Sequence, residues 1–389
     1  MTRSEFDVVV LGVGGMGSAA VHHLARRGHD VLGIERYDVP HARGSSHGLS
    51  RIIRLPQYED PAYVPLVRRA FELWRELDAE HPRRLLHRVG SVDVGPDDGE
   101  SVYAGSKRAC EVHDIPHEDV SGAELNARFP GFDLPPDHRA VYQPDGGFLH
   151  PEQCVVAHVE AAHDHGATVR ARERVEAWEA DGTGVTVRTD RAAYDADRLV
   201  VTAGAWTGQL CPALDPILQP ERQVLGWFQP RRPERFAPEA FPVFVADVEE
   251  GHFYGFPRHE VPGFKLGKFN HRNEVGTPAE LAREPDREDE RLLREFAERY
   301  VPDAAGPTMG LSTCMFTNTP DGDFVLDTHP DFETVVVGAG FSGHGFKFAS
   351  VVGEVLADLA TEGDTRHPIA PFRLDRFDDG SREDDVDRG

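Results

Sequence analysis

Cysteine, lysine and long apolar runs are all scarce in this chain of 389 residues. The cysteines are too few for a disulfide framework and too far apart for the paired ligands of a structural zinc site. No run approaches the roughly 18 apolar residues of a membrane span, and the first residues lack a basic-then-apolar export pattern. These absences predict a cytoplasmic protein in a reducing compartment, with no metal site and no membrane contact. The four cysteines are Cys110, Cys154, Cys211 and Cys314.

Positive charge is also in deficit, with 67 acidic against 42 basic side chains and a formal net charge of −25. A surface of this sign repels phosphate backbones, which excludes nucleic acid as a partner. The acidic excess also favours a halophile-like adaptation, because hydrated carboxylates keep a protein dispersed in concentrated salt. Arginine supplies nearly all the basic charge, so each lysine is an uncommon choice. The only lysines are Lys107, Lys265, Lys268 and Lys347.

The first 35 residues have the pattern of a nucleotide-binding unit. Residues 7–11 and 31–35 are apolar runs, and a glycine-dense turn and a helix-like segment over 18–27 separate them. A strand, tight turn, helix and strand within about 30 residues is typical of the βαβ unit of a doubly wound sheet. We therefore expect a parallel sheet to begin here.

Glycines and one acidic residue in this unit predict dinucleotide binding. Gly12, Gly14 and Gly17 form G-x-G-x-x-G between the strand and the helix, where backbone N–H groups and the helix dipole face a pyrophosphate. Glu35 ends the second strand and is placed to accept hydrogen bonds from a ribose. An acidic residue there disfavours a 2′-phosphate, so FAD or NAD is preferred to NADP.

Strand patterns recur far along the chain, which predicts a discontinuous Rossmann-like domain with a second domain inserted into it. The 39% hydrophobic and 28% charged composition supports globular domains of about 100 to 200 residues each. Short apolar runs broken by Pro and Gly at 220–270 indicate an antiparallel sheet. We expect helices over 61–80, over 280–300 with a break at Pro285, and over 346–360, and strands over 172–187, 198–202 and 334–337.

Five further segments follow in a fixed order: GSSHGLSRIIR at 44–54, AGAW at 203–206, KLGK at 265–268, TCMFTNTPDGDFVLD at 313–327 and GAGFSGHGFKFAS at 338–350. Together they resemble the monomeric sarcosine oxidase and N-methyl-L-tryptophan oxidase family, FAD-dependent amine oxidases of the D-amino-acid-oxidase-like superfamily. The resemblance extends from the first strand through APFRLDRF at 370–377. It implies FAD as the cofactor and an oxidoreductase that acts on CH–NH donors with oxygen as acceptor.

With this resemblance the fold class is α/β, with a discontinuous Rossmann-like FAD-binding domain and an inserted α+β substrate domain built on an antiparallel sheet. We expect the FAD-binding domain to comprise residues 1–84, 146–217 and 312–377. The substrate domain would comprise residues 85–145 and 218–311, and residues 378–389 would form a disordered acidic tail.

The resemblance assigns roles to several residues around the cofactor. Cys314 matches the cysteine that carries the flavin covalently, and a thioether there would raise the potential of the flavin. Lys265 matches a lysine that touches flavin N5 through water and promotes the reaction with oxygen, since a positive charge favours forming superoxide. The other matched residues near the flavin, its cavity or the second glycine turn are Ser45, His47, Arg51, Tyr254, Gly343, His344 and Gly345.

Arg54 and Lys347 match the pair that holds the substrate carboxylate in the family. A fork-shaped guanidinium and an ammonium suit a small carboxylate. Lys347 follows a glycine turn at a predicted helix start, where a cation opposes the helix dipole, so an anion is expected nearby.

The chain departs from the family pattern at three places. Ser46 and His47 stand where two adjacent histidines are usual, and Leu49 and Ser50 stand where Asp and Thr are usual. Phe269 replaces a histidine near the substrate, and His271 is the nearest alternative. The predicted substrate pocket is therefore more apolar than is usual in the family. The identity of the amine substrate stays open, and a substrate bulkier than sarcosine is compatible with this pocket.

The expected reaction removes a hydride from the carbon next to the nitrogen of a secondary (N-methyl) amino acid such as sarcosine. Oxygen takes the electrons from the flavin and is reduced to hydrogen peroxide. The imine formed from the substrate hydrolyses to an amine and an aldehyde. The neutral amine is the reactive form, so activity should rise with pH. We expect a monomer whose partners are a small amino acid and oxygen. Three alternatives stay open: an FAD-dependent dehydrogenase that uses a carrier, an NAD-dependent enzyme, and a non-catalytic dinucleotide-binding protein.

Overall fold

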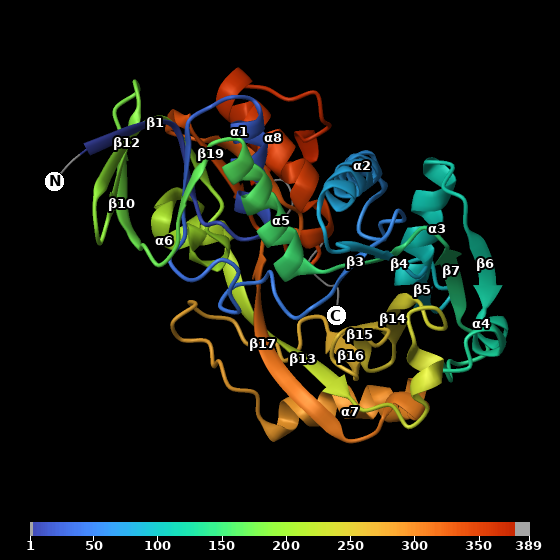
Figure 1. Ribbon diagram of the computed structural model, residues 1–389. Helices are drawn as coiled ribbons and strands as arrows, with labels where there is room; N and C mark the ends of the chain where they lie inside the picture. Colours follow the sequence, from blue (N-terminus) through green and yellow to red (C-terminus); the bar gives the residue numbers. More distant parts are fainter. Residues whose placement is uncertain (1–2, 378–389) are drawn as a thin grey trace.

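The computed structural model describes residues 3–377. Two large β-sheets and one small β-sheet form the framework of this part of the chain (Figure 1). The first large sheet has eight strands, in the order β10-β11-β12-β1-β2-β9, with β18 and β19 joined at β12. These are β1 (Arg3–Leu11), β2 (Val31–Ile34), β9 (Thr168–Arg170), β10 (Val175–Ala180), β11 (Val185–Thr189), β12 (Ala193–Val201), β18 (Val325–His329) and β19 (Phe332–Ala339).

The centre of the first sheet is parallel, as the βαβ pattern predicts. β1 pairs in parallel with β2 on one side and with β12 on the other, and β2 pairs in parallel with β9. The start of β12 pairs antiparallel with β11, while Leu199–Val201 at its end pair in parallel with β19. Strands from the beginning, middle and end of the chain therefore lie side by side, which confirms the discontinuous Rossmann-like arrangement.

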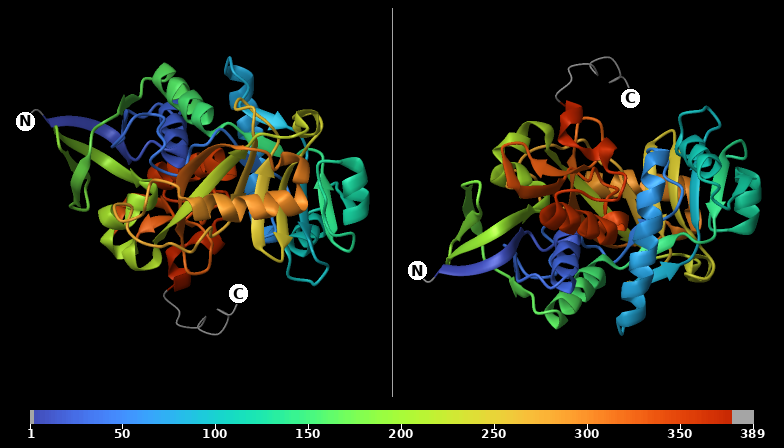
Figure 2. Two further views of the ribbon diagram at one scale, coloured as in Figure 1. Left: turned by 90° about the horizontal axis from the view of Figure 1, so that it is seen from below. Right: turned by 90° about the horizontal axis from the view of Figure 1, so that it is seen from above.

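Helices α1 (Gly15–Arg26), α5 (Pro151–Asp164) and α8 (Ala349–Glu362) pack together beside this sheet, and α2 (Val64–Glu80) packs against α8 (Figures 1 and 2). Small residues allow α1 and α8 to approach closely. A Cβ added at Gly353 would lie 2.5 Å from the carbonyl carbon of Ala19. The short helix α6 (Thr207–Leu210) follows β12. Close packing of α1 fixes its N-terminus at the end of β1.

The second large sheet also has eight strands, in the order β17-β13-β16-β15-β14-β5-β7-β6. Neighbouring strands are antiparallel except β14 and β5, which are parallel. The strands are β5 (Ser91–Gly95), β6 (Glu118–Ser121), β7 (Arg139–Gln143), β13 (Gln219–Phe228), β14 (Val243–Val248), β15 (Gly251–Phe256), β16 (Phe264–Lys268) and β17 (Thr308–Asn318), and the associated helices are α3 (Val102–Val112), α4 (Gly122–Arg128) and α7 (Arg287–Tyr300).

The long strands β13 and β17 run from the second sheet towards the first (Figure 1). Their register places Cys314 opposite Gln223, and β16 places Lys265 opposite Trp227. β17 continues in this sheet to Asn318, past the boundary expected at residue 312. The division into domains stays a prediction, and the predicted tail at 378–389 lies outside the described residues.

The third sheet joins three short antiparallel strands, β3 (Arg51–Ile53), β8 (Gly147–Leu149) and β4 (Leu86–Arg88). β3 also lies beside the 3₁₀ turn η6 (Phe346–Phe348) that precedes α8. This sheet was not predicted, since strands of three residues are too short to show an alternation of apolar and polar side chains. It holds the segment after residue 44 between the two large sheets.

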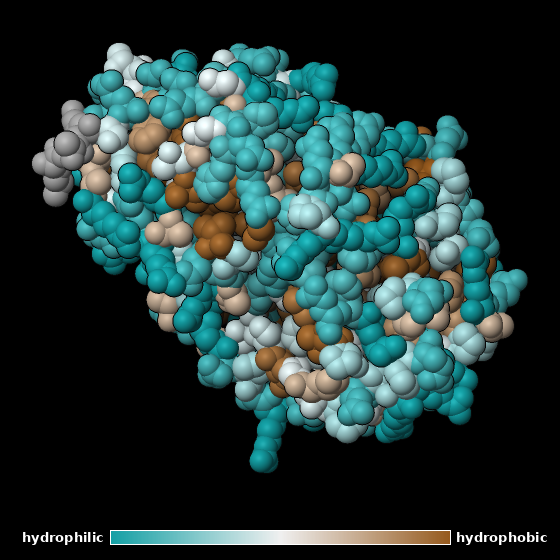
Figure 3. All heavy atoms as spheres, viewed as in Figure 1, coloured by the Kyte–Doolittle hydropathy of each residue, from teal (hydrophilic) through white to brown (hydrophobic). Residues whose placement is uncertain are grey.

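The surface and the helices agree with the polar, acidic composition of the chain. Figure 3 shows a face covered mainly by hydrophilic residues, with apolar side chains visible in separate patches. Within residues 3–377, no helix combines the length and the apolar character that a bilayer crossing requires. All four cysteines are free and buried.

Helix α7 begins at Arg287 rather than at 280, because Pro285 breaks the chain and Asp286 caps the backbone N–H groups of Glu288 and Asp289.

A buried ion pair fastens α7 to the second sheet, and we expect its loss to destabilise the fold. Asp289 is fully buried and accepts hydrogen bonds from Arg222 Nη1 at 3.0 Å and Nη2 at 2.6 Å. Asp289→Ala should lower the free energy of unfolding by about 3–5 kcal/mol, because it leaves a buried guanidinium without its partner. The exposed Glu288→Ala should change it by less than about 1 kcal/mol. Urea unfolding of both variants measures this, and equal effects would contradict the assignment.

Candidate functional site

A cavity of about 570 Å³ lies where the first sheet meets β17, within the range of about 300–1,000 Å³ that ligand sites occupy. Its walls combine the glycine turn after β1, the segment around residue 45, strand β17 and the turn after β19. Seven of the predicted site residues line it: Gly12, Gly14, Glu35, Ser45, Arg51, Gly343 and Gly345.

The glycine turn leaves one side of its backbone open to the cavity. Gly12 has a φ of +88°, and a Cβ there would lie 2.6 Å from the Thr202 carbonyl oxygen. A Cβ on Gly17 would lie 1.8 Å from the Gly12 carbonyl oxygen, so helix and turn can meet only at glycine. At Gly14 the nearest atom to an added Cβ is 3.9 Å away. A pyrophosphate could therefore approach this backbone and the N-terminus of α1.

Glu35 lies at the end of β2 with its carboxylate fixed by the backbone. One oxygen accepts a hydrogen bond from Val13 N at 3.0 Å, and the other accepts one from Tyr37 N at 2.9 Å. A carboxylate has further lone pairs, so it can still accept from ribose hydroxyls in the cavity. The turn, the helix end and this carboxylate fit the phosphates and ribose of a dinucleotide.

Arg51 and Lys265 converge on one carbonyl near the other end of the cavity. Arg51 Nη1 donates to the Ser50 carbonyl oxygen at 2.9 Å, and Lys265 Nζ donates to the same oxygen at 2.7 Å. Arg51 Nη2 donates to the Ser45 carbonyl oxygen at 2.6 Å and lies 3.6 Å from Cys314 Sγ. Burial, together with the neighbouring Arg51, lowers the pKa of Lys265 well below its usual value. The predicted thiol and oxygen-activating lysine are thus joined through Arg51.

Aromatic side chains cover the next part of the wall. The Tyr254 ring lies 5.0 Å from that of Phe269, which lies 5.9 Å from that of Phe316, a residue that lines the cavity. His47 is buried beside this region, and burial together with Arg51 lowers its pKa to about 3. His271 does not take the place of the missing histidine, because its Nε2 lies 3.1 Å from Asp289.

Arg54 and Lys347 lie together as predicted, but an internal carboxylate joins them. Glu59 lies 3.4 Å from Arg54 Nη2 and 3.7 Å from Lys347 Nζ. Burial alone would raise the pKa of Glu59, but Lys347 and Arg54 lower it to about 2. Asp93 lies 3.2 Å from Arg54 Nε, and burial raises its pKa. Burial lowers the pKa of Lys347 to about 8, against the attraction of Glu59.

His344 joins this second cluster and does not line the cavity, unlike its neighbours Gly343 and Gly345. Its Nδ1 lies 3.6 Å from Glu59, and its Nε2 lies 3.2 Å from the Gly322 carbonyl oxygen. Burial lowers its pKa to about 4. The structure therefore forms two groups: Cys314, Ser45, Arg51 and Lys265 in one, and Arg54, Lys347, Glu59 and His344 in the other.

Glu59, Asp93 and Glu152 are the charged residues that sequence reasoning missed. Glu152 accepts hydrogen bonds from the backbone N–H groups of Gly48 and Leu49 at 2.6 and 3.2 Å, and so holds the loop that precedes Arg51. Carboxylates are abundant in this chain, so residue type gave no signal. The sequence feature that could have indicated a role for Glu59 was its position five residues after Arg54 in a short apolar-rich loop.

Comparison with known proteins identifies the family. The model of the DAO family, described as FAD dependent oxidoreductase, matches residues 7–359. The monomeric sarcosine oxidase of Bacillus sp. (strain NS-129) is 41% identical over 377 residues, which cover 96% of this chain and 97% of the relative. The N-methyl-L-tryptophan oxidase of Salmonella typhi is 33% identical, with 96% of this chain and 99% of the relative covered.

Solved structures give the same fold. NikD, an unusual amino acid oxidase essential for nikkomycin biosynthesis, has a TM-score of 0.81 at 28% identity, over 95% of this chain and 98% of NikD. L-proline dehydrogenase from P. horikoshii has a TM-score of 0.84 at 22% identity, over 97% and 99% of the two chains, and supports the fold alone. The glycine turn and Glu35 fit the FAD that the family model names. The chain therefore belongs to the DAO family of FAD-dependent oxidoreductases, in the group that contains the monomeric sarcosine oxidases and N-methyl-L-tryptophan oxidases.

Proposed function

We propose that this protein oxidises an N-methyl amino acid such as sarcosine, with oxygen as acceptor, to hydrogen peroxide and an imine that hydrolyses to an amine and an aldehyde. The observation that carries the proposal is the buried pair Arg54 and Lys347, which already holds a carboxylate and whose Lys347 directly follows Phe346, a residue that lines the dinucleotide cavity. The names of the relatives support the substrate class. Without Arg54 and Lys347 the site would have no means to orient an amino acid.

The substrate carboxylate replaces Glu59 between Arg54 and Lys347. Glu59 marks the position where a carboxylate is stable, because its pKa is lowered to about 2 by Lys347 and Arg54 despite burial. Its contacts at 3.4 and 3.7 Å are longer than the 2.7–2.9 Å of strong charge-assisted bonds, so a free carboxylate can form better ones. Arg54 and Lys347 are then satisfied by substrate, and the substrate is fixed by its carboxyl end.

FAD would lie along the cavity with Gly12, Gly14 and Gly17 at its phosphates and Glu35 at its ribose. When bound, it accepts a hydride from the substrate and passes the electrons to oxygen. We place the covalent attachment at Cys314, whose Sγ lies 3.6 Å from Arg51 Nη2. The other cofactor-contacting residues we propose are Ser45, Gly343, Gly345 and, through the glycine turn, His344.

Lys265 and Arg51 act on the charge that develops at the reacting end of the cavity. Burial disfavours the ammonium form of Lys265, and negative charge arriving nearby favours it. The Arg51 guanidinium and the Lys265 amine meet on one carbonyl oxygen, so an anion arriving there would be stabilised by Arg51 and would favour protonation of Lys265. His47 and Tyr254 complete the wall as neutral groups, because burial lowers the pKa of His47 to about 3 and raises that of Tyr254.

The aromatic wall of Tyr254, Phe269 and Phe316 sets the limits of the substrate pocket. An apolar wall favours the neutral amine, which is the form that can lose a hydride. It also accommodates side chains larger than the hydrogen that sarcosine carries on its α-carbon in place of a side chain. We propose a cytoplasmic monomer, in keeping with the free, buried cysteines and with relatives named monomeric.

Oxidation of a panel of N-methyl amino acids tests the function. With sarcosine or N-methyl-L-tryptophan, we expect the holoenzyme to consume oxygen and to form hydrogen peroxide and formaldehyde in equal amounts. Formaldehyde production that needs an artificial electron carrier would identify a dehydrogenase. A flavin absorbance that no member of the panel bleaches would contradict the proposal and favour a non-catalytic dinucleotide-binding protein.

Replacing Lys265 should separate the two half-reactions. In Lys265→Met, anaerobic bleaching of the flavin by substrate should persist, while the rate of reoxidation by oxygen should fall roughly 10²- to 10³-fold, as for loss of one preorganised charge. Lys268→Met on the same strand β16 is the matched control and should reoxidise at the normal rate. Stopped-flow absorbance measures both rates, and equal reoxidation of the two variants would contradict the role of Lys265.

Carboxylate binding should weaken as the pH rises through about 8. The pKa of Lys347 is lowered by burial to about 8, so its ammonium is present below that pH and lost above it. Acetate has no amine to titrate, and its dissociation constant should increase towards about tenfold per pH unit in this range. Lys347→Met should bind acetate more weakly with a flat profile between pH 7 and 9, as Arg54 stays charged. Two profiles of identical shape would contradict the assignment.

A further inference from the structure

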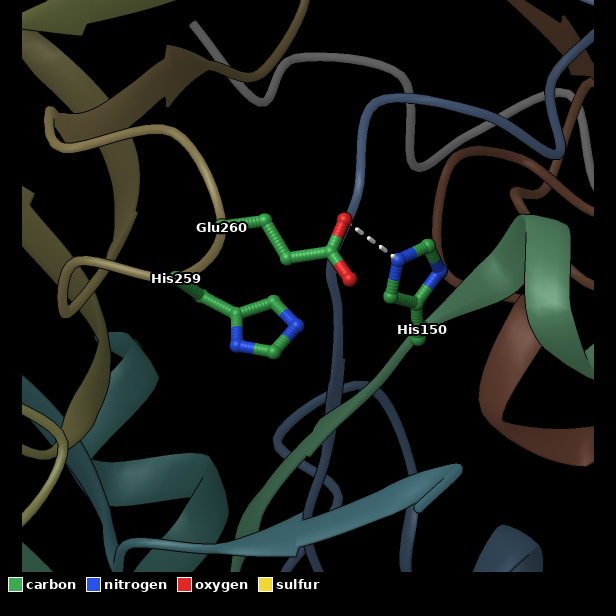
Figure 4. A group of neighbouring side chains, drawn as sticks. All are labelled: His150, His259 and Glu260. Carbon is green, nitrogen blue, oxygen red and sulfur yellow. Dashed lines mark ion pairs between the residues drawn. The ribbon is translucent and has the colours of Figure 1, made fainter. Parts of the chain in front are cut away.

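A group of nitrogen and oxygen donors lies outside the proposed active site, at the junction of the small sheet and the second large sheet. Within residues 3–377, His150, His259 and Glu260 each offer one ligand atom, and these atoms lie within 4.8 Å of one another (Figure 4). His150 directly follows β8 and caps α5, while His259 and Glu260 lie in the loop between β15 and β16. Two distant segments of the chain therefore meet here.

Buried ring nitrogens point into this group. His150 is only 3% exposed, and its Nε2 lies 3.1 Å from Glu260 Oε2 as its one close polar neighbour in the group. Within the described chain, the buried Nε2 of His259 has no hydrogen-bond partner. In Figure 4 the imidazole of His259 presents a nitrogen to the same space. Buried polar atoms are rarely left unpaired, so a missing partner is indicated.

The surroundings have the features of a metal site. His150 Nδ1 lies 3.4 Å from Glu152 Oε2, the carboxylate–imidazole arrangement that orients metal-binding histidines. The rings of His259 and Phe148 lie 4.8 Å apart, which restricts the imidazole. Glu260 is half exposed, so an ion can enter from solvent. Two carboxylates near the group would neutralise a divalent cation.

We propose that His150, His259 and Glu260 form a binding site for a divalent transition-metal ion of the zinc class. Two imidazole nitrogens and one carboxylate oxygen are ligands that zinc prefers, whereas magnesium and calcium prefer oxygen alone. In a tetrahedral zinc site the ligand atoms lie about 3.3 Å apart. The pair His150–Glu260 already has about this spacing, and the ligand atom of His259 lies within 4.8 Å of both, so a modest shift of its loop would complete the set.

The bound ion would clamp the loop before β16 onto the start of α5. Residues 257–263 have no strand of their own, and Lys265 follows directly on β16. Glu152 connects the same site to the backbone of Gly48 and Leu49, which precede Arg51. A metal ion here would therefore stabilise the folded state, since it binds the native arrangement and not the unfolded chain.

Zinc titration of the chelator-treated, flavin-loaded protein tests the site. We expect one tightly bound equivalent of Zn²⁺, none of Mg²⁺ under the same conditions, and a zinc-dependent increase in the melting temperature. X-ray absorption of the zinc-loaded protein should show a first shell of nitrogen and oxygen with two imidazoles. His259→Ala and the conservative Glu260→Gln should each weaken zinc binding roughly 10- to 100-fold or more.

The matched control is His252→Ala, because His252 forms a simple pair with Asp247 at 3.1 Å on the neighbouring hairpin. It should bind zinc as the parent protein does. Both the flavin spectrum and the melting temperature without zinc verify that the variants are folded. Equal zinc affinity of the parent and His259→Ala, or an absence of tight zinc binding in the parent, would overturn the proposal. His150 would then be a protonated bridge between Glu152 and Glu260.

Discussion

Three basic side chains of the proposed site are withdrawn from water in the middle of a strongly acidic protein, and the site depends on which groups hydrogen-bond to them. Arg54, Lys265 and Lys347 are each at most 4% exposed. A buried cation is unstable unless oxygen atoms replace its hydration. The chain provides these from the loop carbonyl of Ser50 and from the carboxylates of Glu59 and Asp93. The packing of the two large sheets is what brings these groups together.

The groups that hydrogen-bond to these basic side chains differ between the two ends of the site. Lys265 shares a neutral carbonyl with Arg51, and no carboxylate hydrogen-bonds to either side chain in the described residues, so this end would favour an arriving anion. Lys347 and Arg54 already face Glu59, so a ligand carboxylate at this end would compete with an internal one for the same two cations. The first arrangement suits the stabilisation of transient charge, and the second suits reversible binding of an acid.

Much of the fold could be read from local patterns. The first βαβ unit, the glycine turn and the strands at 198–202 and 334–337 have strong periodic or glycine signals, and the structure confirms them. The three-residue strands β3, β4 and β8 have none, although they position Arg51 and His150. The predicted break at Pro285 is confirmed by the start of α7 at Arg287, and only the cap at Asp286 was not foreseen.

Candidate site residues were proposed where their residue type is rare, and charged neighbours were missed where theirs is common. Lysine is scarce, so Lys265 and Lys347 were conspicuous, whereas Glu59 and Glu152 could not be distinguished from many other acids. His150 and Glu260 lie more than one hundred residues apart, and only the pairing of distant strands brings them into contact. Metal-ligand spacing along the chain therefore gave no sign of this group, and the sequence predicted no metal.

The central claim is that the reacting end of FAD lies at the corner formed by Cys314, Arg51 and Lys265. Acid precipitation of the holoenzyme, followed by mass spectrometry of peptides from the yellow pellet, tests it most directly. We predict a flavin bound to the peptide that contains Cys314, and a flavin released into the supernatant by Cys314→Ala. Release of the flavin from the parent protein, or its attachment to another residue, would contradict the account.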